Sequence, residues 1–329
     1  MADIARLAGV SISTVSRALS GSTLVNAETR ERVKQLAQSL NYSINLGAQN
    51  LRLQKNLTVG VVVPYDAQSR QHISDPFFLS IVGSIADSLT DHGYDMLLSR
   101  VDSERLDAAS QLYDSGKALG IIIIGQWRHH DQLNQLAARK VPLVVWGGEL
   151  PQQLYCSVGG DNVDGGEQAT AHLLRAGRKK IAFLGDSDLP EVWLRRQGYL
   201  KAHRAAHCQP DVRLDVKVPF EPVAARAAIE QLCDSGIDFD GVVACSDLLA
   251  IQMMQTLRAR GKAVPLDVSV VGYDDMPLAA YCDPPLTTIH QPVDQAGAAL
   301  VDALLRMLGG EKVPPQTLAV RAVVRESAP

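Results

Sequence analysis

Four side chains on one side of a short predicted helix, residues 12–19, carry groups that can read the edge of a DNA base pair. The helical period brings Ile12, Ser13, Ser16 and Arg17 to that side. A guanidinium can make a bidentate contact to guanine, typically worth ~1–3 kcal/mol of discrimination, and Ile12 can contact a thymine methyl group. Nearby hydroxyl and amide groups can bond phosphates: Thr14, Ser16 and Asn26. The alternative is a helix that faces solvent and reads nothing.

The sequence carries no motif that indicates catalysis. The patterns G-x-S-x-G, H-E-x-x-H, G-x-x-x-x-G-K-[ST] and G-x-G-x-x-G do not occur. Asp274 and Asp275 could be considered as an acid–base pair, but adjacent side chains usually point apart. His129, His130 and Asp131 suggest a metal cluster, but neighbouring histidines in a predicted helix do not converge on one ion. We therefore expect no catalytic site, no metal and no cofactor.

Three short helices are predicted in the first forty residues. They cover about 2–8, 12–19 and a stretch after Asn26, with Gly9 in the first turn and Ser11 and Asn26 as N-terminal caps. A helix–turn–helix of this kind can present its second helix to the major groove. Apolar side chains at helical spacing are expected to form the small shared core: Ile4, Leu7, Ala8, Val15, Leu19, Val33, Leu36, Ala37 and Leu40.

From residue 57 onward, apolar strand-like runs alternate with helical stretches. Strands without strict alternation, joined by helices, indicate parallel sheets covered on both faces. The number of units exceeds one comfortable doubly wound sheet, so we expect an α/β body of two lobes. The predicted strands are 57–63, 95–99, 120–125, 143–146, 180–184, 216–218, 241–245 and 269–273, and the predicted helices are 76–92, 105–115, 129–138, 193–206, 223–234 and 247–260.

Charge is distributed unevenly along the 329 residues, whose net charge is −4. Residues 1–57 carry +4 and the remaining residues −8. A basic head on an acidic body favours a nucleic-acid module at the head. The five cysteines are scattered and form no C-x-x-C pair, which is typical of free thiols in a reducing cytoplasm. No secretory signal and no membrane-length apolar run is found, so we expect a cytoplasmic protein.

Two segments of the head resemble the lactose-repressor (galactose-repressor) family of transcription regulators. They are the run from Asp3 to Leu19, and Glu28–Val33 continuing to Leu40-Asn41-Tyr42. The resemblance covers the whole chain and implies sequence-specific binding to double-stranded operator DNA. It also implies a homodimer that places two recognition helices about one DNA turn apart on a pseudo-palindrome. The absence of an added heptad segment near Pro329 favours a dimer over a tetramer.

Residues 45–57 are polar and, taken alone, indicate a linker. In the family, this segment folds into a short hinge helix on the operator, and a leucine from each protomer enters the minor groove. Ala48–Arg52 matches that segment, so the resemblance makes Leu51 the candidate wedge. Ile44 stands where the family usually has proline, which leaves the angle at which the hinge enters less constrained.

The body resembles the family's two-lobed core, which is similar to periplasmic sugar-binding proteins. Matching blocks include Asp75–Phe78, Arg195–Tyr199, Val271–Asp275 and Pro284–Ile289. Ligands of such folds lie outside the carboxyl ends of the strands, and sugars need polar partners and a flat apolar surface. Candidate effector contacts are Asp161, Arg195, Ser246 and Asp274 as polar groups, and Phe77, Phe78, Trp146, Trp193 and Phe220 as apolar surfaces. Weaker candidates are His72, Gln126 and Asp188, and Trp127 also lies near a predicted cleft edge.

These observations predict a three-part chain: a helix-turn-helix domain at 1–44, a hinge at 45–57 and an effector-binding and dimerisation domain at 58–329. The first lobe is expected at about 58–158 and 290–319, and the second at about 159–289 and 320–329. We expect a repressor of carbohydrate-utilisation genes, controlled by a sugar or glucoside. Alternatives are a regulator whose effector strengthens DNA binding, a sugar-binding transport component, and an enzyme of the same architecture.

Overall fold

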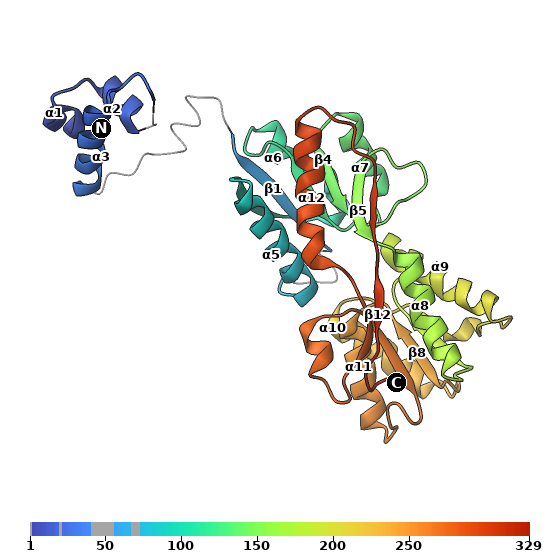
Figure 1. The fold of residues 1–329 in the computed structure, drawn as a ribbon. Helices are drawn as coiled ribbons and strands as arrows, with labels where there is room; N and C mark the ends of the chain where they lie inside the picture. The colour runs from blue at the N-terminus through green and yellow to red at the C-terminus, as the bar shows by residue number, and fades with distance from the viewer. Residues whose placement is uncertain (1, 20–21, 41–55, 67–72) are drawn as a thin grey trace. The chain divides into compact units, whose positions relative to one another are not determined.

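The computed structural model describes residues 2–19, 22–40, 56–66 and 73–329 (Figure 1). The chain divides into two compact units, Met1–Asn56 and Leu57–Pro329. In the described part of the chain, no helix is long and apolar enough to cross a membrane. Three expectations from the sequence, the hinge over 45–55, its wedge Leu51 and the contact at His72, lie outside the described residues.

The head consists of helices α1 (Ala2–Ala8), α2 (Ile12–Leu19) and α3 (Ala27–Ser39), which confirms the three predicted helices. Gly9 has a φ of +66°, and the Ser11 hydroxyl accepts the backbone N–H of Thr14 at 3.1 Å, so the predicted turn and cap are both present. The predicted core was wrong at two positions. Leu7 is 56% exposed and Leu40 is 46% exposed, whereas Ala5, Ala18 and Val25 are buried in the core.

The first lobe is built on a six-stranded sheet in the order β11-β5-β4-β3-β1-β2. Every strand pair in it is parallel. Its strands are β1 (Thr58–Tyr65), β2 (Asp95–Asp102), β3 (Ile121–Ile124), β4 (Leu143–Trp146), β5 (Cys156–Gly160) and β11 (Gln316–Leu318).

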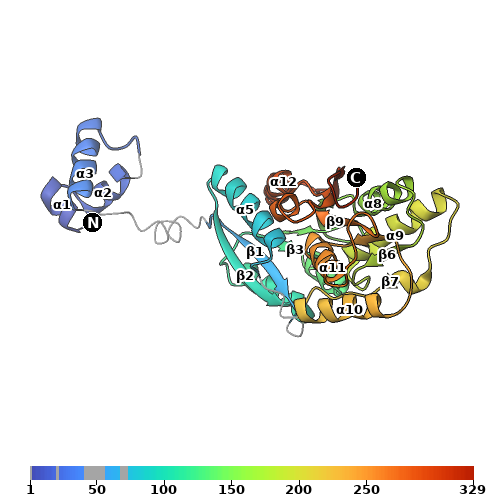
Figure 2. The ribbon, with the colours of Figure 1, turned by 90° about the horizontal axis from the view of Figure 1, so that it is seen from below.

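Helices cover both faces of this first sheet. Helices α5 (Pro76–Asp91) and α12 (Val293–Leu308) lie side by side over one face, as Figures 1 and 2 show. Helix α7 (His130–Ala138) and the 3-10 helix η1 (Ser103–Ser110) pack on the other. Because successive strand side chains point to opposite faces, the isoleucines of β3 alternate between the two cores, which explains its unbroken apolar run.

The second lobe is built on another six-stranded sheet, in the order β12-β10-β9-β8-β6-β7. All its pairs are parallel except the edge pair of β10 and β12, which is antiparallel. Its strands are β6 (Ile181–Leu184), β7 (Asp215–Val216), β8 (Gly241–Ala244), β9 (Ser269–Asp274), β10 (Thr287–His290) and β12 (Arg321–Val323). Its helices are α8 (Asn162–Arg175), α9 (Pro190–Ala205), α10 (Pro222–Asp234) and α11 (Asp247–Ala259).

The chain passes between the two sheets three times. The passages follow β5, β10 and β11, and the last carries the segment after α12 back to the second lobe (Figure 1). The predicted two-lobed α/β architecture is confirmed. Strands β5, β10, β11 and β12 and helices α8 and α12 were not among the predicted elements. The missed strands are short and α8 is rich in glycine and polar residues, whereas α12 has a clear apolar face that the prediction overlooked.

One predicted α-helix was wrong, because the segment forms mainly a 3-10 helix. Residues 105–115 form the 3-10 helix η1 followed by the single turn α6 (Gln111–Asp114), and Arg105 has non-helical φ and ψ of −135° and 49°. A second error concerns the start of α9. The helix begins at Pro190, not Trp193, because proline is well suited to the first helical position. Arg195 therefore lies inside the helix.

Helices α8 and α9 pack closely enough that glycine is required where they meet. A Cβ on Gly198 would lie within 3.0 Å of the carbonyl oxygen of Val163, and one on Gly166 would clash with the carbonyl of Arg195. Backbone atoms cannot move aside as a flexible side chain can. The two glycines thus set the separation of α8 from α9, and with it the position of Arg195.

We expect Gly198→Ala to destabilise the protein by about 1–3 kcal/mol, because the added methyl group overpacks this contact. Gly83→Ala is the matched control, since Gly83 is also helical but a Cβ there meets nothing within 4 Å. That control should stabilise by about 0.5–1 kcal/mol through helix propensity. Chemical denaturation of both variants checks this, and equal effects would contradict it.

Candidate functional site

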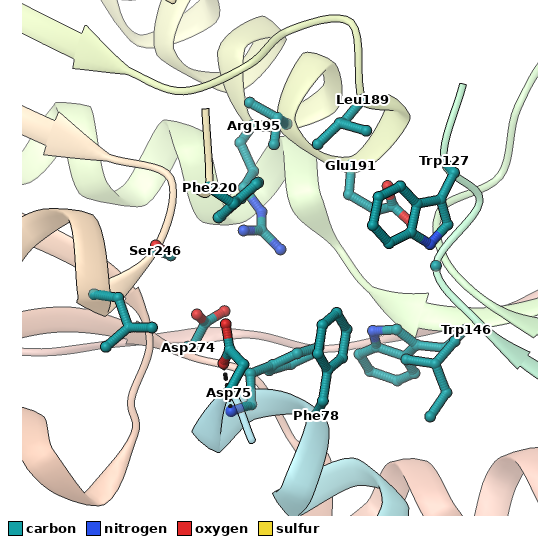
Figure 3. A pocket seen from close by; sticks show the side chains of 15 residues that line it. Asp75, Phe78, Trp127, Trp146, Leu189, Glu191, Arg195, Phe220, Ser246 and Asp274 are labelled. Carbon is teal, nitrogen blue, oxygen red and sulfur yellow. Dashed lines mark hydrogen bonds between the residues drawn. The ribbon is translucent and has the colours of Figure 1, made fainter. Parts of the chain in front are cut away.

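A pocket of about 750 Å³, including solvent at its mouth, opens where the carboxyl ends of the strands of both sheets face each other (Figure 3). This is the place where parallel α/β sheets usually bind ligands. Its charged lining consists of Asp75, Glu191, Arg195 and Asp274. The aromatic lining comes mainly from the first lobe: Phe77, Phe78, Trp127 and Trp146, with Phe220 from the second lobe.

Arg195 projects from α9 into the pocket while remaining only 8% exposed. Its Nε donates to Oδ1 of Asn162 at 2.8 Å, and its Nη1 donates to the carbonyl oxygen of Cys245 at 2.5 Å. Its guanidinium carbon lies 3.7 Å from the centre of the Tyr273 ring. A buried charge is tolerated when it is bonded and compensated in this way. The guanidinium is therefore fixed in orientation.

Each of the three carboxylates in the pocket has a protein partner. The Asp75 carboxylate caps α5 by accepting the N–H of Phe77 at 2.9 Å. Oε1 of Glu191 accepts the N–H of Gln126 at 3.0 Å, a bond that joins the second lobe to the first. Oδ1 of Asp274 accepts Nε2 of Gln291 at 2.7 Å. Burial raises the pKa of both Glu191 and Asp274, which indicates that more bonds to their carboxylates would be favourable.

Aromatic rings form the opposite side of the pocket. The ring centres of Phe77 and Trp146 are 6.4 Å apart, and those of Phe77 and Phe78 are 6.0 Å apart. Trp127 has a φ of 53°, in the left-handed region, and packs against Gly125, where a Cβ would lie 3.1 Å from the indole nitrogen. The loop after β3 thus holds an indole over the cavity, where it offers a flat apolar face.

A buried polar network around Asp247 lies near Asp274. Asp247 is fully buried; its Oδ1 accepts the Thr288 hydroxyl at 2.5 Å and its Oδ2 accepts the N–H of Met276 at 2.8 Å. Burial raises the pKa of Asp247 to about 7. The neighbouring Asp275 pairs instead with Arg325 at 2.6 Å. Asp274 and Asp275 thus have different partners, as expected for adjacent side chains.

Most of the predicted effector contacts line this pocket, but two do not. Asp161 instead caps α8, accepting the N–H of Asp164 at 2.9 Å, and Trp193 is 41% exposed on α9. Neither belongs to the described lining. The lining residues among the predicted contacts are Phe77, Phe78, Trp146, Arg195, Phe220, Ser246 and Asp274.

The weaker candidates lie around the pocket. Gln126 is fully buried and donates to the carbonyl of Gly148 at 2.7 Å, and Asp188 pairs with Lys217 at the surface. Within the described residues, no group of three or more His, Cys, Asp or Glu side chains could hold a metal ion.

The sequence-based prediction missed three lining residues that carry polar or flat surfaces: Asp75, Trp127 and Glu191. Asp75 had a visible signal, since it precedes the proline that starts α5. Trp127 was noted near a cleft edge but was not among the predicted contacts. No spacing in the sequence indicates that Glu191 reaches the N–H of Gln126, because these residues lie in different lobes.

Helix α2 presents the predicted base-reading side to solvent. Ile12 is 53% exposed, Ser13 and Arg17 are exposed, and Ser16 is half-buried. Val15 on the opposite side is fully buried in the head's core. Thr14 is half-buried and bonds Ser11, and Asn26 caps α3 by accepting the N–H of Thr29 at 2.8 Å.

Comparisons with known proteins agree with both units. Residues 1–45 match the model for bacterial regulatory proteins of the lacI family, and residues 170–328 match the periplasmic binding protein-like domain. The HTH-type transcriptional regulator CelR of Thermobifida fusca is 34% identical over 98% of this chain and 96% of its own length. AscG of Escherichia coli K12, also an HTH-type transcriptional regulator, is 31% identical over 99% and 97%.

Two solved structures are similar over nearly the whole chain. A Lac repressor dimer bound to operator and the anti-inducer ONPF has a TM-score of 0.87 at 27% identity, covering 99% of this chain and 98% of that one. A CelR–cellobiose complex has a TM-score of 0.74 at 32% identity, covering 98% of both. The fold and site thus define a helix-turn-helix transcriptional regulator with a periplasmic-binding-protein-like body. The chain belongs to the lacI family of bacterial regulatory proteins.

Asp247 makes the stability of the protein depend on pH. Because burial raises its pKa to about 7, well above the ordinary value of 3.8, the folded state binds a proton that the unfolded state has released. The contribution of Asp247 to the free energy of unfolding is therefore fully present at low pH and is lost as the pH rises through 7. Over this range the free energy of unfolding falls by at most about 1.4 kcal/mol per pH unit.

Asp247→Asn should therefore flatten the decline in unfolding free energy between pH 5 and pH 8. The amide can still accept the N–H of Met276 and donate to Thr288, which preserves the local bonds. Denaturation of the intact protein at both pH values measures the difference. Asp91→Asn, at the exposed end of α5, serves as control, and parallel wild-type and Asp247→Asn profiles would exclude this role.

Proposed function

We propose that this protein is a repressor of carbohydrate-utilisation genes whose operator binding is controlled by a sugar in the pocket between the lobes. One observation carries this proposal: the pocket combines a fixed guanidinium and three carboxylates with a wall of aromatic rings. A sugar can bond the charged groups through its hydroxyls and pack the flat face of its ring on the aromatic wall. The same lining offers no arrangement of nucleophile and base, so we propose a binding function and not an enzymatic one.

The DNA-binding side of the proposal rests on α2 and the segment after the head. Arg17 and Ile12 are exposed on one side of α2, with Ser13 and Ser16 beside them, and we propose that these side chains contact base edges. Thr14 and Asn26 are proposed to bond phosphates, and Leu51 to enter the minor groove. The similar Lac repressor is a dimer on its operator, which supports a cytoplasmic homodimer on a pseudo-palindromic site.

The effector side of the proposal favours a ligand larger than one sugar ring. The charged groups of Arg195 and Asp274 lie toward Phe78, while Trp127 and Trp146 lie further along the pocket (Figure 3). A disaccharide or aryl glycoside would fill both parts. The similar CelR structure contains cellobiose, which supports this size class. We propose that the bound sugar weakens operator binding, with a coupling of about 1–3 kcal/mol.

Arg17→Ala should reduce the preference for operator over random duplex by about 5–150-fold, because it removes a bidentate base contact worth ~1–3 kcal/mol. Arg32→Ala, an exposed arginine of α3, is the comparison. If Arg32 contacts a phosphate, its substitution would weaken binding to the operator and to random duplex by the same factor. Fluorescence anisotropy with both duplexes measures the ratio. Unchanged selectivity in Arg17→Ala would refute the reading role.

Arg195→Lys should leave operator binding intact but abolish release by sugars. Lysine keeps the charge but loses the planar fork that bonds Asn162 and the Cys245 carbonyl. The test is operator anisotropy titrated with a sugar panel, with a thermal melt as a check on folding. Arg204→Lys, exposed near the end of the same helix, should respond like wild type. A normal response in Arg195→Lys would show that the effector binds elsewhere.

A further inference from the structure

The charges that line the pocket are unbalanced. Asp75, Glu191 and Asp274 place three carboxylates in its wall, whereas Arg195 is the single cation among the described lining residues. Figure 3 shows the carboxylates of Asp75 and Asp274 close together on one side, with the guanidinium of Arg195 facing them. With Asp75 ionised, the net charge of this wall is zero or negative, whether or not Glu191 and Asp274 hold protons.

Two hydrogen-bond donors of Arg195 are already used within the protein. Its Nε and Nη1 bond Asn162 and the carbonyl of Cys245. The same guanidinium lowers the pKa of Asp274, while burial, the larger influence, raises it, and Asp247 and Asp75 raise it further. Arg195 therefore acts against a local excess of negative charge, and an incoming anion would compete with Asp274 for it.

Among the described residues, two further cations, Arg128 and Lys217, are already held in ion pairs. Arg128 forms an ion pair with Asp186 and lies 4.0 Å from Asp66. Lys217 pairs with Asp188 and lies 3.3 Å from Asp186. Neither belongs to the described lining. Because each is held by carboxylates outside the cavity, a ligand phosphate would have to break an existing ion pair to recruit one.

The carboxylates determine which hydrogen-bonding groups a ligand needs. An ionised carboxylate only accepts hydrogen bonds, and has about four lone-pair positions for them. Whether ionised or protonated, Glu191 and Asp274 keep acceptor positions beyond their bonds to Gln126 and Gln291. Sugar hydroxyls donate to such positions, whereas phosphate and carboxylate groups bring further negative charge into a partly desolvated site.

We infer that the pocket selects by charge: it takes an uncharged, hydroxyl-rich sugar and rejects the phosphorylated or uronic form of the same sugar. This inference rests on the proposed function, because it narrows the effector class of that site. Asp75 is the residue through which the selection is tested. It is an N-terminal cap, and asparagine caps a helix as well as aspartate does, so the charge can be removed without removing the cap.

The experiment measures sugar binding by the intact protein through tryptophan fluorescence. Trp127 and Trp146 line the pocket, and Trp193, the third tryptophan, does not. The probes are neutral mono- and disaccharides, including cellobiose, each with its 6-phosphate, its uronic acid and its neutral 6-O-acetyl ester. The acetyl ester separates size from charge. We expect the anionic forms to bind on the order of a hundredfold more weakly than the best neutral sugar, with the acetyl ester much less affected.

Asp75→Asn should reduce the ratio of the affinities for neutral and phosphorylated sugar by a factor on the order of ten, because it removes one negative charge that repels the phosphate. Asp102→Asn is the matched control: Asp102 also caps a helix, accepting the N–H of Glu104 at 3.0 Å, but lies outside the described lining. It should keep the wild-type ratio. Equal melting temperatures would establish that both variants fold.

The outcomes separate this inference from the proposed function. If a phosphorylated or uronic sugar binds as tightly as its neutral form, charge selection is overturned while sugar control stands. Charge selection is also overturned if the acetyl ester binds as weakly as the phosphate, because steric fit then explains the rejection. The same holds if the affinity ratio of neutral to phosphorylated sugar is unchanged in Asp75→Asn. If no sugar of either kind changes the fluorescence or the DNA binding, the proposed function itself fails.

Discussion

The second-lobe side of the pocket depends on the burial of one charge, the guanidinium of Arg195. A buried charge costs several kcal/mol unless its hydrogen-bonding groups find partners, and here the partners come from α8, the end of β8 and β9. They can converge only because α8 and α9 approach closely, which Gly166 and Gly198 permit. The guanidinium is thereby oriented before any ligand arrives, which is the condition for selective binding.

The pocket has two chemically different sides because it lies between two separately built sheets. The first lobe contributes most of the aromatic surface, and the second contributes Arg195, Glu191 and Asp274. The first lobe contributes one acidic lining residue, Asp75, among the described residues. A ligand that uses both surfaces necessarily contacts both lobes.

Parts of the site were predictable because local rules decide them. Phe77 and Phe78 follow a capping aspartate and a proline, Ser246 caps α11, and Asp274 ends a strand; each position can be deduced from a strand end or a helix start. Asp161 had the same local signal but its carboxylate caps α8 instead. Trp193 was misplaced because it lies two residues before Arg195 on α9, and residues at that spacing do not share a helix face.

The sequence by itself determined the helices of the head, the alternation of strands and helices in the body, and the face of α2 that meets solvent. These follow from apolar periodicity, caps and glycine turns, which act over a few residues. Only the tertiary structure decided that Glu191 reaches the N–H of Gln126, that Trp127 covers the cavity, and that three carboxylates surround one guanidinium. Those contacts join distant segments, and their geometry depends on how two sheets pack, which no local pattern encodes.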